Sequence, residues 1–481
     1  MRQVPLETAD IAPGRVVQWR ISPSDPACAD QHGKRNRRSA SFNQDKHHSL
    51  IDESRNTGEP LASWLAVTFE IPGTLDRAAL ESALLFLVRR HDVLRCEFQR
   101  VPGNLSYAVH RPDGIELEAV DLGEFDTSRE ILAFLGDSFQ KGIDTMAWPP
   151  YIMGAVLRDD GSTTVYLAFD HIVSDGMSMP NVVRDVHVAY AAHCRGEEPV
   201  LPPPGSYMEF AREQRRSYAS IGVDDDRFAY WRAFIGRNGG VFPRFPLDLG
   251  GEPGRLYRPV NETATLLDDR QAEALESRCR AVGGKPFMGL LAAVAMALRD
   301  EGGPDLYRAL MPLSERGRGT WRDSLGWFVN TLPIEFSVAR DLDFAQVVTG
   351  VRDGFTAMME SIDVPFIRAW ELLAPEHFTG RCWPFPVNFV SYIDMRKCPG
   401  AEHHPLWRPT AHVWASRVNG STSWFQRDTA GLHVNSIYID TPQAHRTMDR
   451  FQRTLRETLR VLATPVVVAS PRAMPDILLR A

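Results

Sequence analysis

The segment Asp170–Gly176, which reads DHIVSDG, combines a histidine with two carboxylates directly after an apolar stretch. In that stretch Val165, Leu167 and Phe169 mark one face of a predicted strand. Continuing the same alternation places His171 on this inward face, at the strand end. An imidazole has an ordinary pKa of about 6.5, so it is mostly neutral at pH 7, as a general base must be. The segment therefore contains a candidate general base at the edge of a packed region, where a ligand can enter.

Asp175 precedes Gly176 in a predicted turn close to this histidine. An unpaired buried carboxylate is costly, so we expect Asp175 to have a cationic partner. Direct contact with the imidazole would favour the protonated ring and weaken the base. We therefore expect Asp175 to point away from His171, towards an arginine.

Two other interpretations of the segment stay open at this point. A single histidine at a strand end is more often a hydrogen-bonded structural residue than a catalyst. A metal site made of Asp170, His171 and Asp175 is also conceivable, although one short loop with only N and O ligands does not match the known ligand spacings. We expect His47 and its neighbour His48, which lie in a polar segment, to be solvated.

The elements that must position this segment are mixed in type. Alternation predicts a strand over Ser63–Ile71, and helical spacing predicts a helix that Thr74 caps and that ends near Arg90. The segment ends the second strand of a predicted hairpin, and a helix fits Met179–Cys194 after it. The second half mixes helices and strands without a regular βαβ alternation, so the sequence predicts a mixed α/β protein.

Composition excludes several classes of function. The chain has 481 residues, 43% of them hydrophobic and 24% charged, which predicts a globular protein of two domains. Its net charge of −7 leaves no basic excess to neutralise a nucleic acid. The longest apolar run, Phe287–Leu298, is shorter than the roughly 20 residues that cross a bilayer, so no transmembrane segment is predicted. Because Met1–Asp10 lacks an apolar signal region, we expect a cytoplasmic protein.

Five segments in one order carry a resemblance to a known superfamily. Asp170–Gly176 resembles the HHxxxDG signature of the condensation superfamily, which includes nonribosomal peptide synthetase condensation domains, chloramphenicol acetyltransferase and polyketide-associated (Pap-type) acyltransferases. The four other segments resemble further motifs of that superfamily: Arg90–Phe98, Tyr207–Ala211, Leu325–Pro333 and Asp363–Phe366. The segments most similar to the Pap-type branch are Pro13-Gly14 with Trp19, Phe245-Pro246-Leu247 and Gly326-Trp327-Phe328.

The resemblance implies a fold of two chloramphenicol-acetyltransferase-like α/β lobes, arranged as a V-shaped pseudodimer with a tunnel between them. The Pro-rich segment Pro199–Gly205 fits the crossing between lobes. We therefore predict one lobe over residues 1–205, which carries the DHxxxDG segment, and the other over residues 206–481.

The resemblance also implies roles for single residues. His171 would be the catalytic base, near the middle of the tunnel, and Asp175 would fix the loop by pairing with Arg95. Backbone N–H near Gly176 is a candidate donor to the oxyanion. Asp170 stands where the superfamily has its first histidine, and we expect a hydrogen-bonded structural carboxylate there. Two residues of the second lobe match a tunnel motif, and we expect Trp327 to pack and Asn330 to bind backbone rather than to catalyse.

The implied reaction is direct acyl transfer without an acyl-enzyme. The donor would be a coenzyme A thioester or a phosphopantetheine thioester on an acyl carrier protein, and the acceptor a hydroxyl of a lipid, sugar or polyketide. We expect a monomer with no bound metal or cofactor. The alternatives are an amide-forming condensation enzyme, a non-catalytic docking module and a metal hydrolase.

Overall fold

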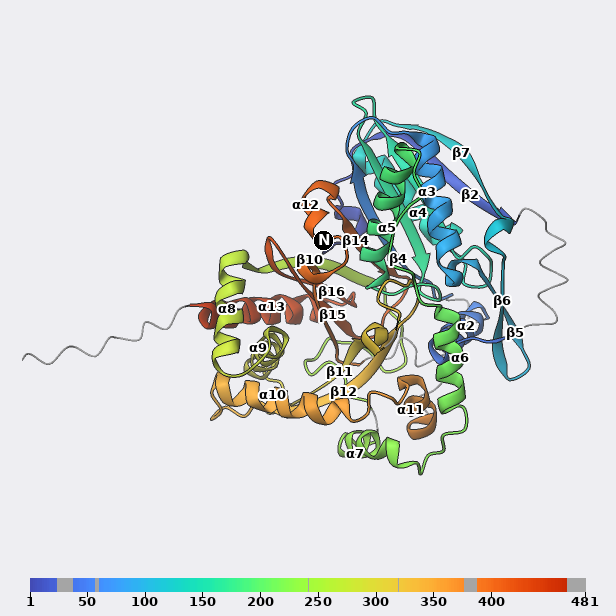
Figure 1. Cartoon of the computed structure of the whole chain (residues 1–481). Coiled ribbons are helices and arrows are strands. Elements are labelled where there is room, and N and C mark those ends of the chain that lie inside the picture. The colour runs from blue at the N-terminus through green and yellow to red at the C-terminus, as the bar shows by residue number, and fades with distance from the viewer. Residues whose placement is uncertain (24–37, 57–59, 241, 319, 376–386, 465–481) are drawn as a thin grey trace, which may run out of the picture.

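The computed structural model describes residues 1–23, 38–56, 60–240, 242–318, 320–375 and 387–464. Two large sheets dominate these ranges and form the centres of two lobes (Figure 1). The mixed α/β, two-lobed fold class predicted from the sequence is confirmed. The tunnel between the lobes and the division at residue 205 stay predictions.

The first sheet has seven strands and carries the DHIVSDG segment at the end of a central strand. In spatial order the strands are β1 (Arg2–Gln3), β14 (Thr410–Ala415), β4 (Ser63–Ile71), β9 (Thr163–Asp170), β8 (Tyr151–Leu157), β2 (Gly14–Pro23) and β7 (Ile115–Phe125). β9 runs antiparallel to both of its neighbours, β4 and β8. Since β14 comes from the second half of the chain and lies beside β4, the first sheet is completed by the second half.

Helices cover both faces of this sheet, and the side chains of β9 alternate between the two faces. Val165, Leu167 and Phe169 pack with α3 (Arg77–Arg90) and α5 (Ser178–Cys194) on one face. Tyr166 and Ala168 pack with α4 (Ser128–Gly142) on the other. The helix α3 begins after Asp76, whose carboxylate accepts a bond from the third residue on, so Asp76 and not Thr74 is its cap. Because both faces of β9 are packed against helices, the end of the strand is held in place, and the loop that follows it starts from a rigid position.

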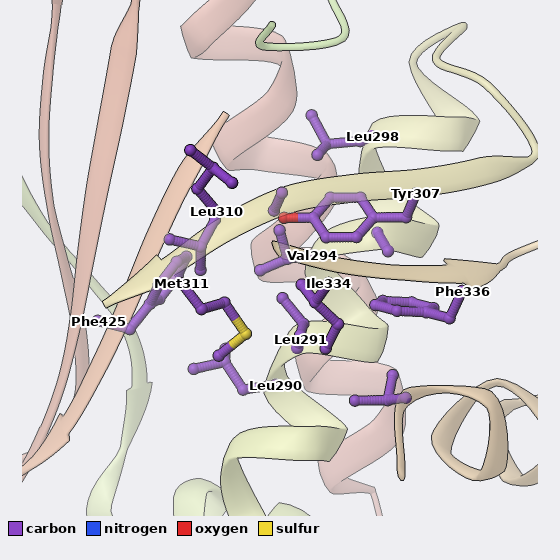
Figure 2. Packing of buried hydrophobic residues seen from close by; sticks show 14 of the residues in the cluster. Leu290, Leu291, Val294, Leu298, Tyr307, Leu310, Met311, Ile334, Phe336 and Phe425 are labelled. Carbon is purple, nitrogen blue, oxygen red and sulfur yellow. The ribbon is translucent and has the colours of Figure 1, made fainter. Parts of the chain in front are cut away.

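The second sheet has six strands: β10 (Pro259–Asp268), β16 (Gly431–Ile439), β15 (Ser421–Asp428), β13 (Phe389–Asp394), β11 (Leu306–Ser314) and β12 (Val329–Ser337). Four helices cover it: α8 (Asp269–Ala281), α9 (Pro286–Asp300), α10 (Phe344–Met359) and α13 (Pro442–Ala463). Figure 2 shows Leu290, Leu291 and Val294 of α9 packed beside Tyr307 and Ile334 of the sheet. The second sheet thus has a hydrophobic core of its own, distinct from the cores of the first sheet.

The remaining elements lie outside the two large sheets. They are β3 (Arg38–Ser39), β5 (Cys96–Val101) and β6 (Asn104–Val109) in a three-stranded sheet, with α2 (Phe42–Arg55), α6 (Tyr207–Tyr218), α7 (Ala229–Arg237), α11 (Phe366–Leu373) and α12 (His404–Trp407). Phe42 of α2 packs in the core of the second lobe, whereas Leu325 and Phe328, which precede β12, pack in the core of the first. This exchange of side chains holds the end of β9 against the second lobe.

Within the described ranges, no single helix is long and apolar enough to cross a membrane. The neighbouring helices α8 and α9 meet the length and composition requirements only together, and they are bent by 99° at their junction.

Candidate active site

The loop between β9 and α5 is folded by its own side chains. The Asp170 carboxylate accepts a hydrogen bond from the backbone N–H of Ile172 at 2.7 Å, which turns the chain at the strand end. Further on, the Asp175 carboxylate accepts bonds from the N–H and the hydroxyl of Ser178 at 2.8 and 2.9 Å, and so binds the start of α5. A carboxylate is favoured at the N-terminus of a helix. The two acidic residues therefore fix the loop at both ends, with His171 between them.

The buried cationic partner of Asp175 is Arg316, which lies 141 residues further along the chain in the second lobe. The guanidinium Nη1 lies 2.6 Å from the carboxylate Oδ2, and the side chains are 6% and 1% exposed. The same Oδ2 accepts the backbone N–H of Phe328 at 3.0 Å. Removing either partner of such a pair leaves an uncompensated buried charge. The second lobe thus holds the loop of the first through one ion pair.

The predicted pairing of Asp175 with Arg95 is wrong. Arg95 donates instead to the backbone carbonyl of His110 at 2.6 Å. The sequence correctly predicted that the buried carboxylate needs a cation. Arg316 lies ten residues before Gly326, the first residue of the segment Gly326-Trp327-Phe328, which is called the GWF motif below. Arg316 was nevertheless missed because pairing across the lobes depends on tertiary structure, which the spacing does not show.

Arg316 is seated on the GWF motif of the second lobe. It donates to the carbonyls of Ser324 and Gly326 at 3.3 and 3.1 Å, and its guanidinium lies 4.7 Å from the ring centre of Phe328. Gly326 has a φ of +144°, and a Cβ there would lie 2.3 Å from the ring of Tyr207. Only glycine fits at this position, because any side chain would clash with the ring of Tyr207.

His171, on the loop between β9 and α5, faces this second-lobe motif. Its ring centre is 3.9 Å from that of Trp327, with 35° between the two planes. The Nδ1 atom is buried without a hydrogen-bond partner among the described residues, whereas the residue as a whole is partly exposed. Burial is the largest cause that lowers the pKa of His171 to about 4, against smaller raising contributions from its own backbone, Asp175 and Asp170. The ring is therefore neutral at pH 7, as a general base requires.

Asp170 occupies a second buried pair behind the loop. Its Oδ1 lies 2.9 Å from Nε2 of His47, and its Oδ2 accepts a bond from the hydroxyl of Thr145 at 2.5 Å. The hydrogen-bonded carboxylate predicted for this position is confirmed. The prediction that His47 and His48 are solvated is wrong, since both residues are buried at 4% exposure.

His47 was missed because α2 has little apolar periodicity. Ser41 and Gln44 cap this helix reciprocally, the capping-box pattern that could have identified its start. The inward side of α2 carries polar residues because it faces the active-site loop: Gln44 donates to the carbonyl of Ile172 at 2.8 Å. When polar side chains face a functional site, the helix lacks the apolar periodicity by which a core-facing helix is recognised in a sequence.

The two second-lobe residues predicted for the tunnel lie in different surroundings. Trp327 contacts His171, as described above. Asn330 donates to the carbonyls of Ile362 and Val364 at 3.0 and 2.9 Å and accepts the N–H of Phe366 at 3.0 Å. The expectation that Asn330 binds backbone is confirmed, and its bonds join the two family-like segments of the second lobe.

Gly176 faces the second sheet. A Cβ built on it would lie 3.8 Å from Cδ1 of Ile393 in β13, an ordinary contact. Within the ranges that the structure describes, no cluster of three or more His, Cys, Asp or Glu side chains is arranged to hold a metal ion. The carboxylates of Asp170 and Asp175 bind separate partners and do not converge with His171.

Comparison with known families fits this geometry. The sequence profile of the Condensation domain matches residues 54–383, which is more than half of the chain. The chain belongs to the condensation-domain family. The match covers all five segments singled out in the sequence, from Arg90–Phe98 to Asp363–Phe366.

Related proteins place the chain near the Pap-type branch. It is 28% identical over 441 residues to the acyltransferase PapA3 of Mycobacterium tuberculosis, covering 88% of this chain and 89% of that protein. It is also 28% identical over 395 residues to the trehalose-2-sulfate acyltransferase PapA2 of Mycobacterium bovis, covering 80% and 81%. Together with the family match, these relatives make the chain an acyltransferase.

Solved structures share the fold. A PapA2 acyl transferase superposes with a TM-score of 0.84 at 23% identity, covering 97% of this chain and 100% of that one. The first condensation domain of the calcium-dependent antibiotic synthetase superposes with a TM-score of 0.66 at 18% identity, covering 89% and 98%. The two-lobed condensation-domain fold is therefore shared over nearly the whole chain.

Proposed function

We propose that this acyltransferase moves an acyl group from a coenzyme A or carrier-protein thioester to a hydroxyl of a sugar or lipid, with His171 as the general base. The acceptor class rests on the names of relatives: one is a trehalose-2-sulfate acyltransferase and another a 2'-acyl-2-O-sulfo-trehalose (hydroxy)phthioceranyltransferase. Both act on acylated or sulfated trehalose, so a disaccharide hydroxyl is the first acceptor to test.

The observation that carries the proposal is a neutral, partly exposed imidazole on a loop that the opposite lobe holds in place. Because Nδ1 is buried, the Nε2 side of the ring is the side that a reactant can approach. Donor and acceptor would reach it through a passage between the lobes. A base held in this way loses little entropy when the reactants bind, which is where positioned catalysts gain their advantage.

The reaction balances without an acyl-enzyme. Nε2 of His171 accepts the hydroxyl proton as the acceptor oxygen attacks the thioester carbonyl. The C–S bond of the resulting tetrahedral intermediate then breaks, and the leaving thiolate takes the proton from the imidazolium. An ester and a free thiol are formed, and His171 is neutral again.

The oxyanion of that intermediate needs donors that are fixed beforehand. The backbone N–H of Gly176 is the candidate, because it donates no hydrogen bond within the described parts of the chain. It lies five residues after the base, on the same fixed loop.

The test is product formation from acetyl-, octanoyl- and palmitoyl-coenzyme A with trehalose and trehalose 2-sulfate, followed by mass spectrometry of the ester and by thiol release. His171→Ala should lower transfer by about 100-fold or more, the typical worth of a general base. His445→Ala, a half-exposed histidine on α13, is the matched control and should transfer like wild type.

Other results would change the assignment. Equal product from wild type and His171→Ala would remove His171 from the mechanism. Transfer to an amine acceptor alone would favour the amide-forming alternative, and thiol release that is independent of acceptor would indicate hydrolysis. No transfer with any thioester would favour a docking module.

A further inference from the structure

One tryptophan of the second lobe packs in none of the hydrophobic cores. This residue is Trp424 of β15, which is half-buried. Every other tryptophan in the described ranges lies in or against one of the three cores. A large aromatic side chain normally buries its area in a core, because that burial stabilises the fold. The indole of Trp424 therefore has apolar area that no core of the described chain covers.

Trp424 lies on the face of the second sheet that is turned to the first lobe. Side chains alternate along β15, and Phe425, the next residue, packs in the core on the helix-covered face (Figure 2). Gln426 shares the face of Trp424, and its Oε1 accepts the backbone N–H of Gln3 in β1 at 2.7 Å. Because β1 belongs to the first sheet, the face that carries Trp424 points towards the first lobe.

Two hydroxyl side chains lie beside the indole on the same face. Ser391 of β13 is the register partner of Trp424, and Thr422 precedes Trp424 by two residues on β15. Ser391 is 8% exposed and Thr422 is half-buried. Among the described residues neither hydroxyl makes a hydrogen bond, although polar groups so close to burial usually find a partner. Both hydroxyls therefore keep bonding capacity for a ligand.

This group of side chains is next to the loop between β9 and α5. Ile393 follows Ser391 by two residues on the same face and packs against the core of the first lobe. Its Cδ1 is the atom that would lie 3.8 Å from a Cβ on Gly176. Two residues of a strand span about 7 Å. Ser391 and Trp424 are therefore one such step along the sheet from the point that contacts the loop of His171.

We propose that Trp424, Ser391 and Thr422 form a subsite for a sugar ring of the acceptor. The proposal rests on the function proposed above, whose acceptor is a sugar hydroxyl. A pyranose ring has a face of C–H groups and a rim of hydroxyls. The C–H face packs on the indole, and the rim hydroxyls bond to Ser391 and Thr422. Aromatic area with a few placed polar groups is the usual composition of a small-molecule site.

The surroundings fit a sugar better than an acyl chain. An acyl chain on the indole would leave the two hydroxyls covered and unbonded, which costs free energy. On the other side of Trp424 its register partner is Asn435 of β16, another polar residue. The amide of Asn435 is bonded to the side chains of Gln3 and Asn261 at 2.7 and 2.8 Å, so it is held in place and does not compete for the ligand.

Trp424→Leu tests the subsite, with Trp414→Leu as the matched control. Trp414 is also a half-buried strand residue, but its ring stacks on Trp64 at 5.9 Å between ring centres, in a core of the first lobe. Trp424→Leu should raise the KM for trehalose about tenfold or more, the worth of burying a large apolar side chain, and leave the KM for octanoyl-coenzyme A unchanged. Trp414→Leu should leave both KM values unchanged. Ser391→Ala should raise the KM for trehalose several-fold, the worth of one hydrogen bond.

Binding without turnover separates the subsite from the base. With His171→Ala as the parent protein, calorimetric titration with trehalose 2-sulfate should give a Kd about tenfold higher once Trp424→Leu is added. Trp424→Phe keeps an aromatic face and should lose less affinity, and it replaces Trp424→Leu if that variant does not fold. Sugar binding that depends on Trp424 would support the subsite even if no acyl transfer were found.

Three results would overturn the subsite while leaving His171 as the base. The first is an unchanged KM and Kd for the sugar in Trp424→Leu. The second is a rise in the KM for octanoyl-coenzyme A in place of the KM for trehalose, which would assign the indole to the donor. The third is a parent protein that transfers acyl groups before His171 is replaced but binds neither trehalose nor trehalose 2-sulfate.

Discussion

The two lobes each contain a strand that leads into a long helix, and only the first of these connections contains the proposed general base. In the first lobe, β9 leads into α5 through a loop with buried charges. In the second lobe, β16 leads into α13 through Asp440 and Thr441. There Thr441 caps the helix, and Asp440 pairs with His445 at 2.9 Å, with side chains that are 52% and 49% exposed.

Both connections contain an aspartate and a histidine, so residue type does not separate them. The difference is contact with the opposite lobe. The first connection receives Arg316 and Trp327 from the second half of the chain, which bury its charges and cover its ring. The second connection stays at the surface, where solvent weakens the pair. His171, on the connection that the opposite lobe covers, has a strongly lowered pKa, and such perturbed groups are candidates for function.

The largest effect is expected when Arg316, the cation that the second lobe provides, is removed. Arg316→Ala should lower the free energy of unfolding by about 3–5 kcal/mol, because it leaves Asp175 buried and unpaired. Urea unfolding at pH 7 measures the change. Arg95→Ala is the control: it removes one bond to a carbonyl and should cost about 1–2 kcal/mol. If Arg95→Ala lowered the free energy of unfolding more than Arg316→Ala, the result would favour the pairing of Asp175 with Arg95 that was predicted from the sequence.

The surface pair should show the smallest effect. Asp440→Asn should change the free energy of unfolding by no more than about 0.5 kcal/mol, because an exposed ion pair contributes little. Acyl transfer should match that of wild type. A loss comparable to that of Arg316→Ala would mean that exposure does not distinguish the two connections.

The sequence predicted the parts of the site that depend on local pattern. The alternation in β9 and the DHIVSDG spacing located His171 and the buried acid Asp175, and the GWF segment indicated Trp327. It did not predict Arg316 or His47. Arg316 is far along the chain, and any of many arginines would satisfy the same electrostatic requirement. His47 lies on a polar helix whose inward face is turned to a site and not to a core.

The most direct test of the central claim, a neutral base at His171, is the pH dependence of kcat/KM for acyl transfer by wild type. Burial sets the pKa of His171 near 4, so its neutral fraction barely changes between pH 7 and 5.5. The same depressed pKa means that His171 disfavours the folded state as pH falls from about 6.5 towards 4, so the folded fraction must be followed by circular dichroism. We predict that kcat/KM stays within about twofold from pH 7 to 5.5, since a shift to about 4 leaves the base in its active form. A fall of roughly tenfold over that range, with the protein still folded, would indicate a base with an ordinary pKa and would contradict the account.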